Sequence, residues 1–92
     1  MTLRGLIDAG LLTPPLELER SYKGEHFTAR VEADGRVSFR GASYHSLSTA
    51  AAAARSAALG ASSYVTTNGW VFWEFRDERG KLVPMDVLRR RA

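Results

Sequence analysis

The chain of 92 residues contains no cysteine, which excludes disulfide bonds and thiolate metal ligands. Its two histidines, His26 and His45, have no carboxylate beside them at a spacing that suggests a catalytic or metal site. No apolar run approaches the about 20 residues that a membrane-spanning helix needs, and the first residues do not resemble a signal peptide. We therefore expect a cytoplasmic protein that acts without a membrane, a metal or another cofactor.

Catalytic motifs are also missing from the sequence. There is no nucleophile motif, no pair of acids placed on one face and no glycine loop that would cradle a phosphate. The eight glycines all lie where turns or helix ends are expected. A chain of this length has room for one small domain, and we expect residues 1–92 to form a single domain that is not an enzyme.

Positively charged residues outnumber negatively charged residues only slightly. The chain has 13 lysines and arginines against 10 acidic residues, and the three consecutive arginines at 89–91 account for the net charge of +3. Residues 20–55 are nevertheless mildly basic, with more cations than acids. Such an asymmetry directs a polyanion to one side of a small domain. It is compatible with nucleic-acid binding but does not by itself establish it.

The first part of the chain changes from a helical pattern to a strand pattern. Thr2 is suited to cap a short helix with Leu3, Leu6 and Ile7 at helical spacing, and Gly10 is suited to end it. After two prolines, apolar residues recur at every second position, which indicates strands. The side chains expected on one face of three strands are Leu16, Leu18, Arg20, Tyr22, Phe27, Ala29, Val31, Ala33, Val37 and Phe39.

The parity of these apolar positions predicts the turns, because directly opposed residues share a sheet face. Pairing Leu18 with Ala29 closes the first hairpin with a two-residue loop, which is a favoured length. Pairing Val31 with Val37 leaves a three-residue loop with Gly35 in the left-handed conformation. A two-residue second loop would instead misalign the apolar face, so we predict the three-residue form.

An alanine-rich segment follows and predicts a long helix that packs on the sheet. Ser46 or Ser48 caps its start, Gly60 ends it, and alanine has the highest helix propensity. The polar segment 61–67 then forms a connector, with a short edge strand expected around 64–66. On a helical wheel, the apolar arc of the helix consists of Leu47, Ala50, Ala53, Ala54, Ala57 and Ala58.

Four of the nine aromatic residues fall in the segment NGWVFWEF, residues 68–75. We predict a strand that begins after an Asn-Gly turn. One face of this strand passes from aromatic to charged residues along its length. Trp70 stands at the aromatic end of that face and is best placed to form a platform for a flat ligand such as a nucleobase. Alternation gives a core face and a second face, formed respectively by Val71, Trp73 and Phe75, and by Trp70, Phe72, Glu74 and Arg76.

A turn at 77–80 and a short last helix complete the chain, with Pro84 expected at the first position of that helix. The predicted fold is α+β: a small antiparallel sheet of about four to five strands with an N-terminal helix, the alanine-rich helix on the sheet and a short C-terminal helix.

The start of the alanine-rich helix carries three hydroxyls, at Ser46, Ser48 and Thr49, next to Tyr44 and His45. Helix starts offer free backbone N–H groups and partial positive charge, which suit phosphate. Capping of the helix itself needs only one of these hydroxyls. A contact with a phosphate or a base edge would account for the others, and both explanations stay open.

Several segments together resemble one family, the restriction enzyme adenine methylase-associated (RAMA) domain. The most specific marks are the segments GASYHSLSTAAAAA and NGWVFWEF, followed by GKLVPMDVLR. LRGLIDAGLL and ELERSYKGEHFTARVEADGRVSFRG match the same pattern, so the resemblance covers nearly the whole chain. Two departures are Leu47, where family members often have proline, and a segment at 54–67 that is longer than usual.

This resemblance implies an accessory module that reads DNA with a modified base such as N6-methyladenine. It also implies a methyltransferase or nuclease as a possible partner in a restriction-modification system, and a homo-oligomer is compatible with it. The alternative is a protein-interaction or oligomerisation module that does not contact DNA. For the DNA-binding hypothesis, the residues expected in the specific site are Tyr44, His45, Ser46, Ser48, Thr49, Asn68 and Trp70, and those expected to contact phosphate are Lys23, Arg40 and Arg55.

Overall fold

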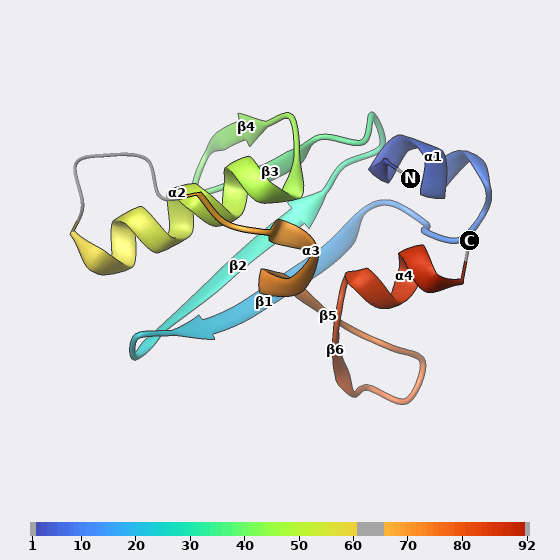
Figure 1. The fold of residues 1–92 in the computed structure, drawn as a ribbon. Helices are drawn as coiled ribbons and strands as arrows, with labels where there is room; N and C mark the ends of the chain where they lie inside the picture. Colours follow the sequence, from blue (N-terminus) through green and yellow to red (C-terminus); the bar gives the residue numbers. More distant parts are fainter. Residues whose placement is uncertain (1, 61–65, 92) are drawn as a thin grey trace.

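Figure 1 shows the computed structural model of the chain, which describes residues 2–60 and 66–91. The six strands found in these residues form one antiparallel sheet in the order β4-β3-β2-β1-β5-β6. The predicted α+β class is confirmed, and the sheet has more strands than the four to five expected. The elements are α1 (Leu3–Asp8), β1 (Leu16–Tyr22), β2 (Glu25–Val31), β3 (Val37–Phe39), β4 (Ala42–Tyr44), α2 (Leu47–Leu59), α3 (Gly69–Phe72), β5 (Glu74–Arg76), β6 (Leu82–Pro84) and α4 (Asp86–Arg90).

The two predicted hairpin registers are confirmed. In the longest hairpin, β1–β2, Leu18 lies opposite Ala29 across a two-residue turn. In the next hairpin, β2–β3, Val31 lies opposite Val37, and Gly35 adopts the expected left-handed conformation with φ 84°. The apolar parity of the strands was therefore sufficient to predict both registers.

Strand β4 was not predicted, because a glycine at position 41 indicates the end of the preceding strand and no second strand was expected directly after it. Residues 40 and 41 instead form a two-residue turn, and β4 pairs antiparallel with β3. The predicted edge strand around 64–66 falls largely outside the described residues, and residue 66 has no regular secondary structure. One edge of the sheet is thus formed by β4, which directly precedes the start of α2.

Burial along the strands shows that one face of the sheet is covered. In β2 the side chains of Phe27, Ala29 and Val31 are buried, and those between them are exposed. Helix α2 packs against α3 and against β3 and β4, so these helices cover the buried face (Figure 1). The other face carries ion pairs such as Arg30 Nε to Glu17 Oε1, at 2.7 Å.

The predicted helix starts are confirmed by their caps. Thr2 Oγ1 accepts a hydrogen bond from the backbone N–H of Gly5 at 3.0 Å, and Ser46 Oγ accepts one from Thr49 N–H at 3.1 Å. Helix α2 ends at Gly60, as expected. The caps satisfy backbone donors that a helix start otherwise leaves without a partner.

The buried face of α2 differs in part from the predicted arc. Ala51 and Ala52 are fully buried, whereas Ala57 is exposed. The first half of the helix is enclosed between α3 on one side and β3 and β4 on the other, so burial extends around more of its circumference. Its C-terminal end, yellow in Figure 1, projects away from α3.

The prediction that one strand begins directly after an Asn68-Gly69 turn is wrong. Asn68 caps the four-residue helix α3, and β5 begins only at Glu74. Successive residues of a helical turn differ by about 100° in direction and do not alternate. Val71, expected in the core, is therefore 56% exposed, while Phe72, expected on the outer face, is buried. Trp73, expected in the core, is fully buried.

At the C-terminal end, the turn at 77–80 is confirmed, but the position of Pro84 is not. Pro84 ends β6, which lies at the edge of the sheet, and the helix begins at Asp86 after Met85. A proline without an N–H is tolerated on an edge strand. Arg89 and Arg90 occupy the last turn of α4.

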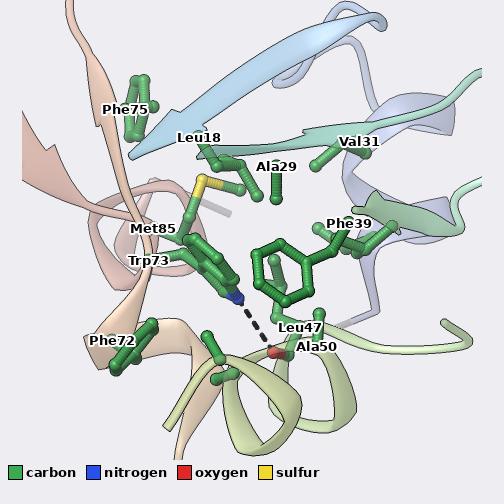
Figure 2. Packing of buried hydrophobic residues seen from close by; sticks show 14 of the residues in the cluster. Leu18, Ala29, Val31, Phe39, Leu47, Ala50, Phe72, Trp73, Phe75 and Met85 are labelled. Carbon is green, nitrogen blue, oxygen red and sulfur yellow. Dashed lines mark hydrogen bonds between the residues drawn. The ribbon is translucent and has the colours of Figure 1, made fainter. Parts of the chain in front are cut away.

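The hydrophobic core is centred on Trp73 (Figure 2). Its ring lies edge-on to Phe39 and Phe72, with centroid distances of 5.8 and 5.1 Å. Met85, which precedes α4, is also fully buried, so the C-terminal helix is joined to this core. This tryptophan also contacts the start of α2, next to the candidate functional site.

Candidate functional site

The starts of α2 and α3 are held together by four residues, Leu47, Ser48, Gly69 and Trp73, which we call the α2–α3 joint. The backbone N–H of Gly69 donates to Ser48 Oγ at 3.0 Å. The indole Nε1–H of Trp73 donates to Leu47 O at 3.1 Å, the dashed line in Figure 2. A Cβ on Gly69 would lie 2.1 Å from the Leu47 carbonyl carbon. Only glycine lets the two backbones approach so closely.

The three hydroxyls at the start of α2 all have partners within the chain. Ser46 and Thr49 form a capping box, in which each side chain accepts a hydrogen bond from the backbone N–H of the other, at 3.1 and 3.2 Å. The Ser48 hydroxyl accepts the hydrogen bond from Gly69 N–H in the α2–α3 joint. The fold thus accounts for all three hydroxyls, and their contact with DNA stays a prediction.

A hollow of about 430 Å³ lies beside this helix start, and we call it the Trp70 hollow. It brings together four of the predicted specific-site residues, His45, Ser46, Ser48 and Trp70. Its other wall is formed by the start of α1 and the β2–β3 turn, through Thr2, Leu3, Arg4, Asp34, Gly35 and Arg36.

Trp70 is half-buried, and its ring carries a cation on one face. The guanidinium carbon of Arg89 lies 4.5 Å from the ring centroid. Arg89 in turn is hydrogen-bonded to Asp86, and this hydrogen bond is the main cause of the lowered pKa of the Asp86 carboxyl. The stack and the ion pair together fix the indole in place.

The cations of the Trp70 hollow differ in their pairing. Arg4 is exposed and lies 3.4 Å from Asp8 in the same helix, an ion pair of the weak surface type. Arg36 donates from Nε to Ser43 Oγ at 2.7 Å, so its charge is oriented by a neutral partner. His45 is exposed at the mouth. The hollow therefore combines an aromatic ring with two arginines and one acidic residue, Asp34.

Tyr44 and Thr49 line a neighbouring hollow of about 300 Å³. This second hollow shares Arg36 and His45 with the Trp70 hollow, so the two adjoin. Tyr44 also packs against the core ring of Phe39 at 6.4 Å. The predicted residues 44–49 therefore lie together, around the first turn of α2.

Asn68 lies apart from this group, although it is close to Trp70 in sequence. Its side-chain oxygen accepts a hydrogen bond from the Trp70 N–H at 3.1 Å and so caps α3. It lines a different hollow, on the other side of α3, together with Arg55. The structure therefore does not place Asn68 in the same hollow as the ring of Trp70.

The three residues predicted to contact phosphate do not all lie in one place. Arg55 donates to the hydroxyl of Tyr22 at 3.1 Å, and the ammonium of Lys23 lies 5.9 Å from the centroid of the same ring. Arg40 forms an ion pair with Glu25 at 3.4 Å. Lys23 and Arg55 thus share one aromatic neighbour, while the charge of Arg40 is partly neutralised.

Sequence reasoning missed Arg4, Asp34 and Arg36 as residues of the site. They come from a helix start and a turn, and Gly35 in that turn lies directly against the Arg4 backbone. A local pattern contains no signal for this contact, because the two segments are about thirty positions apart. The two hydrogen-bonding residues of the turn, Asp34 and Arg36, were visible only as turn formers.

The fold and its hollows define a small α+β domain with a basic, aromatic-lined candidate binding site beside the start of α2. Residues 1–91 match the family model Restriction Enzyme Adenine Methylase Associated (RAMA), so the chain belongs to the RAMA family. The family is named for its association with restriction enzymes and adenine methylases. No significant match is found among curated proteins.

No helix in residues 2–60 and 66–91 is long and apolar enough to cross a membrane. The same residues hold no cluster of three side chains that could ligate a metal ion.

Proposed function

We propose that the chain is a non-catalytic DNA-binding module of a bacterial restriction-modification system, acting in the cytoplasm, that reads a modified base such as N6-methyladenine. The observation that carries this proposal is the Trp70 hollow. Its volume of about 430 Å³ lies within the roughly 300–1,000 Å³ of small-ligand sites. An indole in its wall and arginines at its rim are the groups that a base and its flanking phosphates require.

The hydrogen bonds and stacking contacts of the side chains around the Trp70 hollow favour binding over catalysis. Ser46 and Ser48 are engaged in the helix cap and the α2–α3 joint, so their hydroxyls are committed to structure. Trp70 is held in place by Arg89, and a fixed aromatic surface loses little freedom when a base stacks on it. A methyl group on the base adds apolar area that an indole can cover.

The test compares matched duplexes with and without one N6-methyladenine, titrated with the protein at several salt concentrations. We expect tighter binding to the methylated duplex and an affinity that falls as salt rises. Trp70→Ala should weaken binding by about 1–3 kcal/mol, the usual contribution of one stacked base. Trp73→Ala is the matched variant: it should cost about 3–5 kcal/mol of unfolding free energy, because its ring is fully buried.

The contrary results are equally definite. If neither duplex binds at low salt, the chain is not a DNA-binding module, and self-association or a protein partner becomes the function to test. If Trp70→Ala unfolds the domain as Trp73→Ala does, the role of Trp70 as a platform is wrong. Thermal unfolding of both variants, recorded beside the titrations, separates these cases.

A further inference from the structure

A second basic hollow, of about 250 Å³, lies on the opposite side of α3 from the Trp70 hollow. It is formed by the end of β1, the middle of α2 and the exposed side of α3, and we call it the Arg20 hollow. Trp70 and Val71 are neighbours on α3, yet one lines the first hollow and the other lines the second. The residues of the Arg20 hollow used below are Arg20, Tyr22, Arg55, Asn68, Val71 and Phe72.

Arg20 is the unusual member of this hollow, because it stands on the core-facing side of β1. Its guanidinium carbon lies 5.3 Å from the ring centroid of Phe72, a cation–π contact. Its Nε is buried and has no hydrogen-bond partner in the described chain. A guanidinium that is partly desolvated and lacks an anionic partner is costly to maintain for stability alone. The arrangement is one that an incoming anion would complete.

Arg55 places a second positive charge in the same hollow, in a fixed orientation. Its Nε donates to the Tyr22 hydroxyl at 3.1 Å, and its Nη1 donates to Thr67 Oγ1 at 3.1 Å and to Thr66 O at 3.3 Å. All three partners are neutral, so the charge of the guanidinium is retained. A cation already held in position binds a phosphate with little further loss of side-chain freedom.

The carboxylates of the sheet are engaged elsewhere. In residues 2–60 and 66–91, neither Arg20 nor Arg55 has an ion pair. Glu17 and Glu19, which precede Arg20 on β1, point to the opposite face of the sheet, where Glu17 pairs with Arg30. Cations on that face, such as Arg30 and Arg76, are paired with carboxylates, whereas Arg20 and Arg55 on the helical face have no ion pair in the described residues. A polyanion is therefore directed to the helical face.

We propose that the Arg20 hollow binds a phosphate of the DNA backbone, with Arg20 as its anchoring cation and Arg55 as the second. This inference rests on the proposed function and deepens it. A pair of arginines matches the fork geometry of phosphate oxygens. Because the hollow lies across α3 from Trp70, one phosphate held there would set the position of the DNA relative to the Trp70 hollow.

The experiment measures binding of a fluorescein-labelled duplex over a salt series with wild type, Arg20→Gln and Arg30→Gln. For Arg20→Gln we expect the slope of log K against log salt to become shallower by about 0.9, the value for one lost phosphate contact. Affinity at low salt should fall about tenfold. Arg30→Gln removes an equal charge from the opposite sheet face and should leave the slope unchanged. The preference for the methylated duplex should persist in both variants, since phosphate contacts carry no base information.

A companion variant and a modified DNA keep the test independent of folding. Arg20→Lys retains the charge without the fork, so we expect a wild-type slope with reduced affinity. Thermal unfolding checks that every variant is folded. Duplexes with a neutral methylphosphonate at single positions then locate the phosphate on wild type. At that position the substitution should cost wild type about tenfold and should cost Arg20→Gln clearly less, because only Arg55 then remains as a partner of that phosphate.

The outcomes distinguish this inference from the proposed function. If wild type binds DNA and Arg20→Gln behaves as Arg30→Gln does, the phosphate site is wrong and the DNA-binding function stands. A changed preference for the methylated base with an unchanged slope would assign Arg20 to base contact and also overturn the inference. If wild type binds no DNA at low salt, both fail. Polyglutamate binding that Arg20→Gln abolishes would then assign the hollow to an acidic protein.

Discussion

Gly69 shows how a single residue determines the geometry of the candidate site. The absence of a side chain lets α3 begin directly against the first peptide group of α2, and its N–H then reaches the Ser48 hydroxyl. Trp73, four positions later, donates from its indole to the neighbouring carbonyl of Leu47. Ser48, Gly69 and Trp73, which belong to the two family motifs, are therefore explained by one close contact between two helices.

This contact predicts a large effect for the smallest possible substitution. Gly69→Ala would place a methyl group 2.1 Å from the Leu47 carbonyl carbon, and backbone atoms cannot turn aside as a flexible side chain can. We expect a loss of about 3 kcal/mol or more in unfolding free energy, at the upper end of overpacking costs. Urea unfolding followed by tryptophan fluorescence measures it.

Val71→Ala is the matched control for this substitution. It changes an exposed side chain of the same four-residue helix, so its effect should stay within about 0.5 kcal/mol. A Gly69→Ala variant as stable as Val71→Ala would show that α2 and α3 can separate freely, and that the α2–α3 joint does not position Trp70.

At the scale of elements, the start of α2 combines two separate structural tasks within three residues. Ser46 and Thr49 close the capping box, while Ser48 reaches out of the helix to the backbone of α3. The first task is local and would exist in an isolated helix. The second exists only when the tertiary structure has formed. The two serines should therefore respond differently to mutation.

Ser46→Ala removes an N-cap acceptor and should cost about 1 kcal/mol. Ser48→Ala leaves the N–H of the buried Gly69 without its acceptor and should cost about 1–3 kcal/mol. The distinguishing measurement is near-ultraviolet circular dichroism of the tryptophans, which Ser48→Ala should alter at low temperature and Ser46→Ala should leave unchanged. Identical spectra for the two variants would mean that Ser48 does not hold α3.

The difference between local and tertiary signals also explains how much of this fold the sequence predicted. The two hairpin registers follow from the alternation of residues such as Leu18 and Ala29, which is a local pattern, and they are confirmed. The segment at 68–75 was predicted as a strand because four residues are too few to separate a helical period from alternation. The outcome depends on the contact between Gly69 and Leu47, which lies outside any local window.

The candidate site was predictable to the same extent. The residues around the first turn of α2 were found together, because one helix start brings them together by sequence alone. Arg4 and Arg36 join them only through packing of α1 on the β2–β3 turn. Arg20 was assigned to an apolar strand face, and its place beside Phe72 depends on the unpredicted helix α3.

At the scale of the whole molecule, the last quarter of the chain closes the structure and supports the site. Strand β5 pairs with β1, and the buried Met85 brings α4 against the core. From α4, Arg89 covers one face of Trp70 while bonded to Asp86. The position of the proposed platform therefore depends on the Asp86 carboxylate, which makes it sensitive to acid.

Two aspartates of this segment have a pKa below the ordinary value of 3.8. The pKa of Asp77 is lowered chiefly by the backbone N–H of Lys81, and that of Asp86 chiefly by the hydrogen bond from Arg89. A carboxylate with a lowered pKa in the folded state contributes stability that is fully present above 3.8. That contribution is lost as pH falls through the lowered pKa.

We therefore expect the free energy of unfolding to decrease as the solution is acidified below pH 3.8, and to decrease less steeply in Asp77→Asn and Asp86→Asn. Urea unfolding at a series of pH values measures this. Only Asp86→Asn should also change the environment of Trp70 at neutral pH, because Arg89 then loses its anionic partner, and tryptophan fluorescence reports it. If Asp77→Asn alters that fluorescence equally, the change reflects general loosening of the segment, and Arg89 does not hold the indole.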